Sequence, residues 1–163
     1  MKNLFLAVLI LIISSCSNTI YLVRHAEKET TASDTPLSTK GKSRATSLSE
    51  LLANKNIQHI FSTNTLRTIS TATPLKERLK NIPIQLYTSR LDSIDLFVAQ
   101  LKKLKANALV VAHSNTVNIL TNKLVGSTVI AQSLPDSVYN RIFVVKRKGN
   151  KFLFTEKNYE NFK

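Results

Sequence analysis

Two histidines and two arginines in this sequence share one setting. They are Arg24, His25, Arg67 and His113. Each follows, directly or within one helical turn, a short apolar run typical of a buried strand, and the runs are Ile20–Val23, Ile57–Phe61 and Leu109–Ala112. A guanidinium group presents a planar fork of donors that matches phosphate oxygens, and a neutral imidazole can attack phosphorus and carry the phosphoryl group covalently. The four residue types together predict a phosphoryl-transfer site.

This chemistry depends on elements that bring the four side chains to one place. Three further strand-like runs are present, at Ile82–Leu86, Ile142–Val145 and Phe152–Phe154. Between the first four runs of the chain lie stretches with apolar residues at helical spacing. Alternating strands and helices predict an α/β three-layer sandwich, with a mostly parallel central sheet and helices on both faces. Ligands of such sheets bind beyond the carboxyl ends of the strands, where the four residues stand.

Two details of the predicted elements can be tested against a structure. Pro74 lies within the helical pattern of residues 66–79, and we expect it to kink that helix or end it after Thr73. The last two runs flank Lys148-Gly149-Asn150, a turn sequence. This arrangement predicts an antiparallel hairpin at the C-terminal edge of the sheet.

Composition argues against several other classes of protein. The 163 residues are 43% hydrophobic and 20% charged, which suits one globular domain rather than a disordered chain. The single Cys excludes an internal disulfide framework and a cysteine-rich zinc site. The sequence has no Gly-rich phosphate loop, and its acidic residues are too scattered for an evident magnesium cage. We therefore expect no metal and no cofactor.

Four blocks of sequence resemble the histidine phosphatase superfamily, which includes the phosphoglycerate mutases. In chain order they are Tyr21–Glu27 (YLVRHAE), Pro36–Ala45 (PLSTKGKSRA), Phe61–Ala72 (FSTNTLRTISTA) and Val110–Thr116 (VVAHSNT). The first resembles the Arg-His-Gly-Glu signature of the family, and the combination is far more specific than any one block. The short chain resembles the compact branch first known for acting on phosphohistidine.

The resemblance implies a role for each of the four residues. His25 is the nucleophile that becomes phosphohistidine, Arg24 and Arg67 bind the phosphoryl oxygens, and His113 completes the pocket. The implied activity is metal-independent hydrolysis of a phosphomonoester or phosphoramidate, on a small phosphorylated substrate or a phosphoprotein. An inactive relative that binds a phosphorylated anionic ligand in the same pocket is the alternative, because function resides in the site and not in the fold.

The sequence departs from the family pattern in two respects. Ala26 stands where the family has Gly, which matters if that position needs a positive φ or close approach of the phosphate. The general acid that protonates the leaving group is not evident. Asp92 is our candidate, Asp95 is nearby, and an N-cap of the following helix is the competing role for Asp92. Glu27 is close to His25 in sequence, where it could serve to orient the loop.

The N-terminus has the features of an export signal. Lys2 precedes an apolar run, Leu4–Ile13, which is shorter than the roughly 20 residues of a membrane-spanning helix. The sequence Ile13-Ser14-Ser15-Cys16 resembles a bacterial lipobox, which implies lipidation of Cys16. We therefore predict a signal peptide at 1–15, a lipidated tether at 16–19 and a phosphatase domain at 20–163. The predicted location is the cell envelope, lipid-anchored to a membrane; a plain signal peptide is the alternative.

The formal charge of +13 is spread along the chain, with dense clusters at Lys102–Lys105 and Lys146–Lys148. Solvated surface is the favoured interpretation of these clusters, and attraction to anionic lipid head groups is the alternative. A nucleic-acid partner is not expected, because the aromatic residues do not interleave with the clusters. A glycolytic mutase is also disfavoured, because an exported protein would not meet its cytosolic substrate.

Overall fold

The computed structural model describes residues 17–162 of the chain. The predicted signal peptide at 1–15 and the predicted lipidation site Cys16 lie outside the described residues. Among the described residues, no helix is long and apolar enough to cross a membrane.

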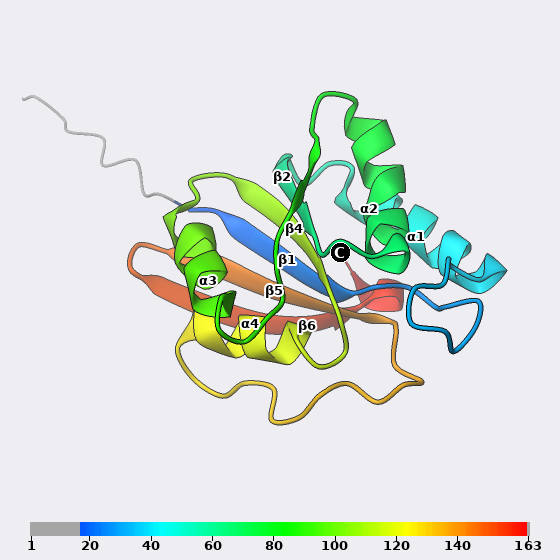
Figure 1. Cartoon of the computed structure of the whole chain (residues 1–163). Coiled ribbons are helices and arrows are strands. Elements are labelled where there is room, and N and C mark those ends of the chain that lie inside the picture. Colours follow the sequence, from blue (N-terminus) through cyan, green and yellow to red (C-terminus); the bar gives the residue numbers. More distant parts are fainter. Residues whose placement is uncertain (1–16, 163) are drawn as a thin grey trace, which may run out of the picture.

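Six strands form one sheet in the order β3-β2-β4-β1-β5-β6 (Figure 1). The first four strands of the chain run parallel to one another. They are β1 (Thr19–Arg24), β2 (Ile57–Ser62), β3 (Ile84–Leu86) and β4 (Asn107–Ala112). The last two, β5 (Arg141–Lys148) and β6 (Lys151–Asn158), form an antiparallel hairpin at one edge of the sheet. The predicted α/β class with a mostly parallel sheet and an edge hairpin is confirmed.

The helices cover both faces of this sheet (Figure 1). They are α1 (Thr39–Leu52), α2 (Leu66–Leu79), α3 (Ile94–Lys103) and α4 (Val117–Val125), followed by the short 3-10 helix η1 (Tyr159–Asn161). Alternate residues of β1 face opposite sides, as a strand requires. Tyr21 and Val23 pack in the core formed with α1 and α2, whereas Ile20 and Leu22 pack in the core formed with α3 and α4.

The hairpin turn consists of Gly149 and Asn150, between Lys148 and its partner Lys151. Gly149 has a φ of 62°, a value that glycine adopts without steric cost and that two-residue hairpin turns require. The hairpin that the turn sequence predicted is therefore confirmed.

The helix α2 does not end at Pro74, so the break that we expected as one of two outcomes is wrong, and the other outcome, a kink, stays a prediction. The helix continues to Leu79. Proline removes one backbone hydrogen bond from a helix interior, at a cost of about 3 kcal/mol. Burial offsets that cost, because Ala72 and Leu75 on either side are fully buried in the core. The hydroxyl of Ser49 in α1 also donates to the carbonyl of Pro74 at 3.1 Å, which ties the two helices together.

Candidate active site

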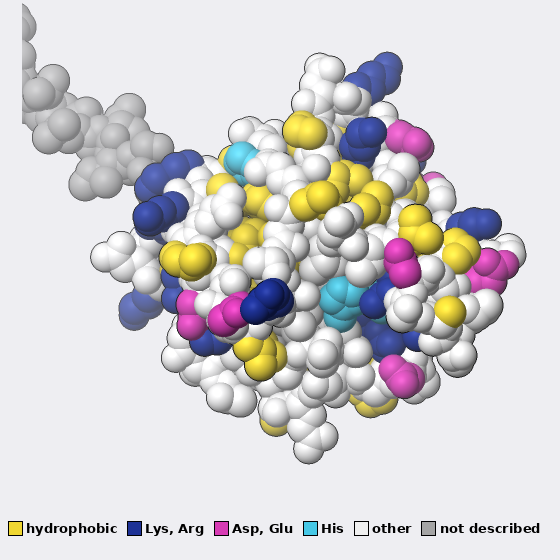
Figure 2. Space-filling model, in the orientation of Figure 1, with side chains coloured by type: hydrophobic (Ala, Val, Ile, Leu, Met, Phe, Trp, Pro, Cys, Tyr) yellow, Lys and Arg dark blue, Asp and Glu magenta, His cyan; other side chains and the backbone are white. Residues whose placement is uncertain are grey.

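A cavity of about 500 Å³ lies beyond the carboxyl ends of β1, β2 and β4, as expected for a parallel sheet. Its lining residues are Arg24, His25, Lys28, Arg67, Ser89, His113, Ser114, Asn115, Thr116 and Asp136. Figure 2 shows histidine beside Lys and Arg side chains at this place on the surface. The structure therefore brings together all four residues that the sequence placed at the ends of strands. The rings of His25 and His113 stand edge to face with their centroids 5.6 Å apart, close enough to contact one small anion.

Hydrogen bonds fix the backbone of His25 and one of its two ring nitrogens, Nδ1. Its backbone N–H donates to the carbonyl of Ala112 at 2.9 Å, which continues the β1–β4 pairing by one residue. Its Nδ1 lies 2.8 Å from the carbonyl oxygen of Ala26. Because a carbonyl oxygen can only accept, Nδ1 carries the proton of the neutral ring. The lone pair is then on Nε2, which is the form that a nucleophile requires.

Both histidines are neutral in the folded protein. Burial, with a smaller contribution from the positive charges of Arg24 and Arg67, lowers the pKa of His25 to about 3, although the hydrogen bond to the Ala26 carbonyl acts in the opposite direction. Burial, with the same two arginines, lowers the pKa of His113 to about 4. Desolvation and neighbouring positive charge both disfavour the protonated imidazole. The cavity thus keeps its positive charge on the guanidinium groups and leaves the imidazoles unprotonated.

The ring of His113 is oriented by two hydrogen bonds, one that it accepts and one that it donates. Arg67 Nη2 lies 3.3 Å from Nδ1, and because an arginine can only donate, Nδ1 accepts. The proton is therefore on Nε2, which donates to the hydroxyl of Thr63 at 2.8 Å. Thr63 in turn donates to Thr68 at 3.0 Å. This chain from α2 fixes both the tautomer of His113 and the angle at which it faces the cavity.

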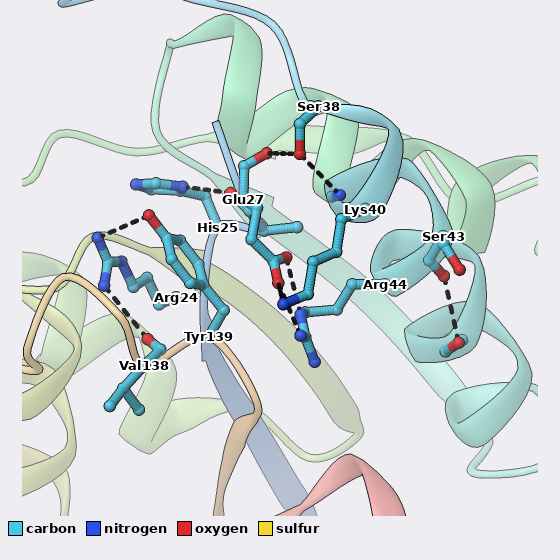
Figure 3. A network of polar contacts seen from close by, with 12 residues as sticks. Arg24, His25, Glu27, Ser38, Lys40, Ser43, Arg44, Val138 and Tyr139 are labelled. Atoms are coloured by element: carbon cyan, nitrogen blue, oxygen red, sulfur yellow. Dashed lines mark hydrogen bonds and ion pairs between the residues drawn. The ribbon is translucent and has the colours of Figure 1, made fainter. Parts of the chain in front are cut away.

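Arg24 is buried and held by the loop that precedes β5 (Figure 3). Its Nη1 donates to the carbonyl of Pro135 at 2.8 Å and to that of Val138 at 3.2 Å. Its Nη2 donates to Asp136 Oδ1 at 3.1 Å and to the hydroxyl of Tyr139 at 3.3 Å. The ring of Tyr139 also lies under the guanidinium, 4.1 Å from ring centroid to Cζ. These contacts fix the plane of the guanidinium beside the cavity.

Each arginine of the cavity has a buried Nε atom without a hydrogen-bond partner among the described residues. The Nε atoms of Arg24 and Arg67 are buried and have no hydrogen-bond partner in the described part of the chain, where Asn118 Oδ1 is the one other side-chain atom in that condition. Buried polar groups in native proteins are normally paired, so an unpaired donor calls for an explanation. Both arginines also line the cavity, so an oxyanion bound there would meet two guanidinium groups.

Contacts with α1 hold the segment after His25 in place (Figure 3). Arg44 makes two hydrogen bonds to the carboxylate of Glu27, at 2.7 and 2.8 Å. Burial by itself raises the pKa of Glu27, but the bonds to Arg44 outweigh it and the pKa is lowered. The carbonyl of Glu27 accepts from the backbone N–H of Ser38 at 3.0 Å. Glu27 therefore orients the loop, as expected, and does not line the cavity.

Ala26 fits the site without backbone strain. Within residues 17–162 the non-glycine residues with positive φ are Asn56 and Lys80, so Ala26 has an ordinary conformation. Its methyl group is fully buried, and its N–H donates to the hydroxyl of Thr71 at 2.9 Å. The replacement of the family glycine by alanine is accommodated at this position.

Asp92 is not brought to the cavity. Its carboxylate is exposed and accepts a hydrogen bond from Arg90 at 2.8 Å. The bonds from Ser93 and Arg90 lower its pKa, which favours the ionised form that cannot donate a proton. It does not cap α3, whose N-cap is Ser93. This arrangement lends no support to Asp92 as general acid, and that role stays a prediction.

Sequence reasoning missed Lys28, Ser89, Asp136 and Tyr139, which line the cavity or contact Arg24. Asp136 and Tyr139 lie in the irregular stretch between α4 and β5, with no motif or periodicity around them. No feature of the linear sequence connects that stretch to Arg24, more than 100 positions earlier. Only the tertiary contacts reveal the connection.

The depressed histidine pKa values predict how stability depends on pH. Below about pH 6.5 the unfolded chain protonates both imidazoles while the folded protein does not, so the free energy of unfolding falls as pH falls from 6.5 toward 4. We expect His113→Gln to reduce this slope by up to about 1.4 kcal/mol per pH unit, the amount that one proton contributes. Urea unfolding between pH 4.5 and 7 measures the slope, and equal slopes in the two proteins would contradict the prediction.

Comparison with known proteins agrees with the geometry. The model of the histidine phosphatase superfamily (branch 1) matches residues 20–98. The chain therefore belongs to the histidine phosphatase superfamily, and it is a phosphatase. No curated protein matches it in sequence.

Solved structures with the same fold are similar to this chain at low sequence identity. A protein histidine phosphatase SixA with tungstate bound has a TM-score of 0.70 and 20% identity, covering 89% of this chain and 99% of that one. A putative α-ribazole-5'-P phosphatase from Escherichia coli has a TM-score of 0.68 and 15% identity, over 89% and 98%. A putative phosphohistidine phosphatase SixA from Agrobacterium tumefaciens has a TM-score of 0.62 and 18% identity, over 84% and 95%. At these identities the likeness establishes the fold.

Proposed function

We propose that this phosphatase hydrolyses a phosphomonoester or a phosphoramidate through a covalent phosphohistidine at His25, without a metal ion. One observation carries the proposal: Arg24 and Arg67 line one cavity with His25, whose Nδ1 bond to the Ala26 carbonyl leaves the lone pair on Nε2. Donors for the phosphoryl oxygens and a nucleophile for phosphorus are then present together. The two guanidinium groups supply the positive charge that a metal ion supplies in other phosphatases.

The reaction takes two steps. In the first, Nε2 of His25 forms a bond to phosphorus while the bond from phosphorus to the leaving oxygen or nitrogen breaks, and the leaving group takes up a proton. In the second, water attacks phosphorus, the bond to His25 breaks, and phosphate leaves with His25 restored to its neutral form. Arg24 and Arg67 bind the oxygens throughout, and His113, in contact with Arg67, closes the other side of the phosphoryl group.

The carboxyl groups near the cavity bear on the choice of substrate. Asp136 is the one acidic side chain that lines it within the described residues, and it accepts a hydrogen bond from Arg24. An alkoxide leaving group needs a proton from an acid in the transition state. An imidazole leaving group is far less basic, and it can take its proton from water. We therefore place phosphorylated histidine first among the substrates, and the structural similarity to protein histidine phosphatases supports this order.

Trapping the intermediate tests the proposal. Brief reaction with a phosphate-labelled substrate, followed by denaturation, should leave label on the protein that survives alkali and is lost in acid, as a phosphoramidate bond requires. We expect His25→Asn to abolish the label. His59→Asn should retain it, because His59 lies on β2 and does not line the cavity. Label that persists in His25→Asn, or turnover by the wild-type protein with no labelled species at any time, would contradict the mechanism.

We propose further that the protein is a lipoprotein of the bacterial cell envelope, attached through Cys16. The support is the sequence alone: a short apolar run, then small residues and the chain's single Cys. More than one acyl chain at that position gives stable membrane attachment, since each buried methylene contributes about 0.8 kcal/mol.

We expect Cys16→Ala to move the protein from the membrane fraction to the soluble envelope fraction without loss of specific phosphatase activity. Fractionation of cells and assay of each fraction measure both quantities. Ser15→Ala, a neighbouring change that leaves the thiol in place, should remain with the membrane. Continued membrane attachment of Cys16→Ala would refute lipidation.

A further inference from the structure

The edge of the sheet opposite the cavity is formed by the amino ends of the parallel strands. β1 begins there at Thr19, β2 at Ile57 and β4 at Asn107. The antiparallel β5 ends at the same edge, because Lys146 pairs with Thr19. Four segments that are far apart in the sequence therefore meet at this edge.

Eight basic residues lie at this edge, in or beside three of these segments. They are Lys55, Lys102, Lys103, Lys105, Lys146, Arg147, Lys148 and Lys151. The segments 53–58, 102–107 and 145–152 that contain them hold no Asp or Glu. We call these eight residues the basic edge. Figure 2 shows Lys and Arg side chains gathering at the end of the molecule where β1 begins.

Backbone contacts hold the parts of the basic edge in place. The N–H of Arg147 donates to the carbonyl of Asn18 at 2.8 Å, and its Nη1 donates to the carbonyl of Lys102 at 3.1 Å. The side chain of Asn107 donates to the carbonyl of Lys55 at 2.6 Å. The two clusters that are separate in the sequence are thus one surface in the structure. The dipole of α3 favours basic residues in its last turn, which explains the positions of Lys102 and Lys103 but not those of the other six basic residues.

We propose that the basic edge docks on an anionic membrane surface. A surface with many positive charges and no acidic residue in its segments is complementary to a layer of anionic head groups, to which each basic residue near the surface adds about a factor of five in binding. The chain also enters the domain at this edge. Cys16 is three residues before Thr19, and three residues span at most about 11 Å. The choice of a membrane as partner agrees with the envelope location proposed above, although docking itself does not require the lipid.

Docking in this way orients the active site. β1 runs from Thr19 at the basic edge to Arg24 at the cavity, a distance of about 17 Å at the usual rise per strand residue. The cavity therefore opens away from the bilayer. Its substrate would be a phosphorylated molecule in solution or on a protein, rather than a lipid of the same membrane.

Vesicle binding by the chain from Ser17 onward tests the proposal in the absence of the lipid and the signal peptide. All described strands and helices lie between Thr19 and Asn161, so this chain retains the whole sheet and both cores. We expect it to bind vesicles that contain phosphatidylglycerol and not vesicles of phosphatidylcholine, with binding that weakens as salt is raised. Lys103→Glu with Lys148→Glu, both exposed, should weaken binding by at least about 25-fold, from two factors of about five.

The matched control is Lys42→Glu with Lys76→Glu, which changes the net charge equally at exposed positions on α1 and α2. It should bind anionic vesicles nearly as well as the unmodified chain. All three proteins should hydrolyse a soluble phosphorylated substrate at the same rate, which also verifies their folding. Equal loss of binding in the two variants, no binding to anionic vesicles at physiological salt, or tight binding to duplex DNA in preference to vesicles would each overturn the proposal.

Discussion

A His25→Asn variant is expected to lose at least about 10⁴-fold in kcat/KM for any substrate that the wild-type protein hydrolyses. The reason is that the reaction proceeds through the Nε2 lone pair, which the bond from Nδ1 to the Ala26 carbonyl keeps directed away from its own backbone. Removing the nucleophile of a covalent mechanism typically costs several orders of magnitude, and what remains is catalysis by the charged groups around it. Steady-state kinetics with a phosphohistidine or aryl phosphate substrate measure the loss.

Binding distinguishes this effect from a collapsed site. Arg24 and Arg67 are anchored by the loop before β5 and by His113, and neither arginine has a contact with His25 among its hydrogen bonds. Inorganic phosphate should therefore inhibit or bind the variant within about tenfold of its wild-type affinity. A variant that keeps more than about 1% of the wild-type rate would mean that water attacks phosphorus directly. A wild-type protein that binds phosphate but hydrolyses no substrate would instead favour the binding protein considered as the alternative.

Gly41→Ala is expected to destabilise the protein by about 2–3 kcal/mol, in spite of the usual preference of helices for alanine. Gly41 is buried in the first turn of α1, and a Cβ atom there would lie 2.2 Å from the carbonyl oxygen of Glu27. The atom it meets is backbone, which is itself hydrogen-bonded to Ser38 and held through the Arg44 ion pair. The helix and the segment after His25 must move apart, so activity should fall together with stability.

Thermal unfolding measures the first part of this prediction. A loss of 2–3 kcal/mol should lower Tm by about 5–10 °C in a chain of this length. Thr46→Ala, at an exposed position on the same helix, should change Tm by no more than about 2 °C. In an unhindered helix, glycine to alanine raises stability by about 1 kcal/mol, so an unchanged or higher Tm for Gly41→Ala would mean that the contact with Glu27 does not constrain the fold.

Both predictions concern the same short segment, residues 25–27, which is held from three sides. β4 binds its start through Ala112, α2 binds Ala26 through Thr71, and α1 clamps Glu27. A nucleophile must be held within a fraction of an ångström to gain the rate advantage of proximity. We therefore expect changes in this segment's supports to lower kcat more than they raise KM.

Much of the fold could be predicted from the sequence because its signals are local. Apolar runs of three to five residues mark the strands, helical spacing marks the segments between the first four of them, and Gly149 marks the hairpin turn. Parallel strands place their carboxyl ends at one edge, so the sequence also predicted that Arg24, His25, Arg67 and His113 would meet. Pro74 does not end its helix, which was one of the two outcomes expected for it, because burial of Ala72 and Leu75 overrides a local rule for helix ends.

Only the tertiary structure decided the contacts between segments that no sequence pattern connects. Arg24 donates hydrogen bonds to Pro135, Asp136 and Tyr139, which lie in an irregular loop more than 100 positions later in the chain. The proton positions on His25 and His113 depend on which atoms lie opposite the rings. The basic edge exists because three segments that are distant in the sequence meet at one side of the sheet. Local patterns specify elements and their order, whereas hydrogen bonding and charge act over a few ångströms of space, whatever the distance along the chain.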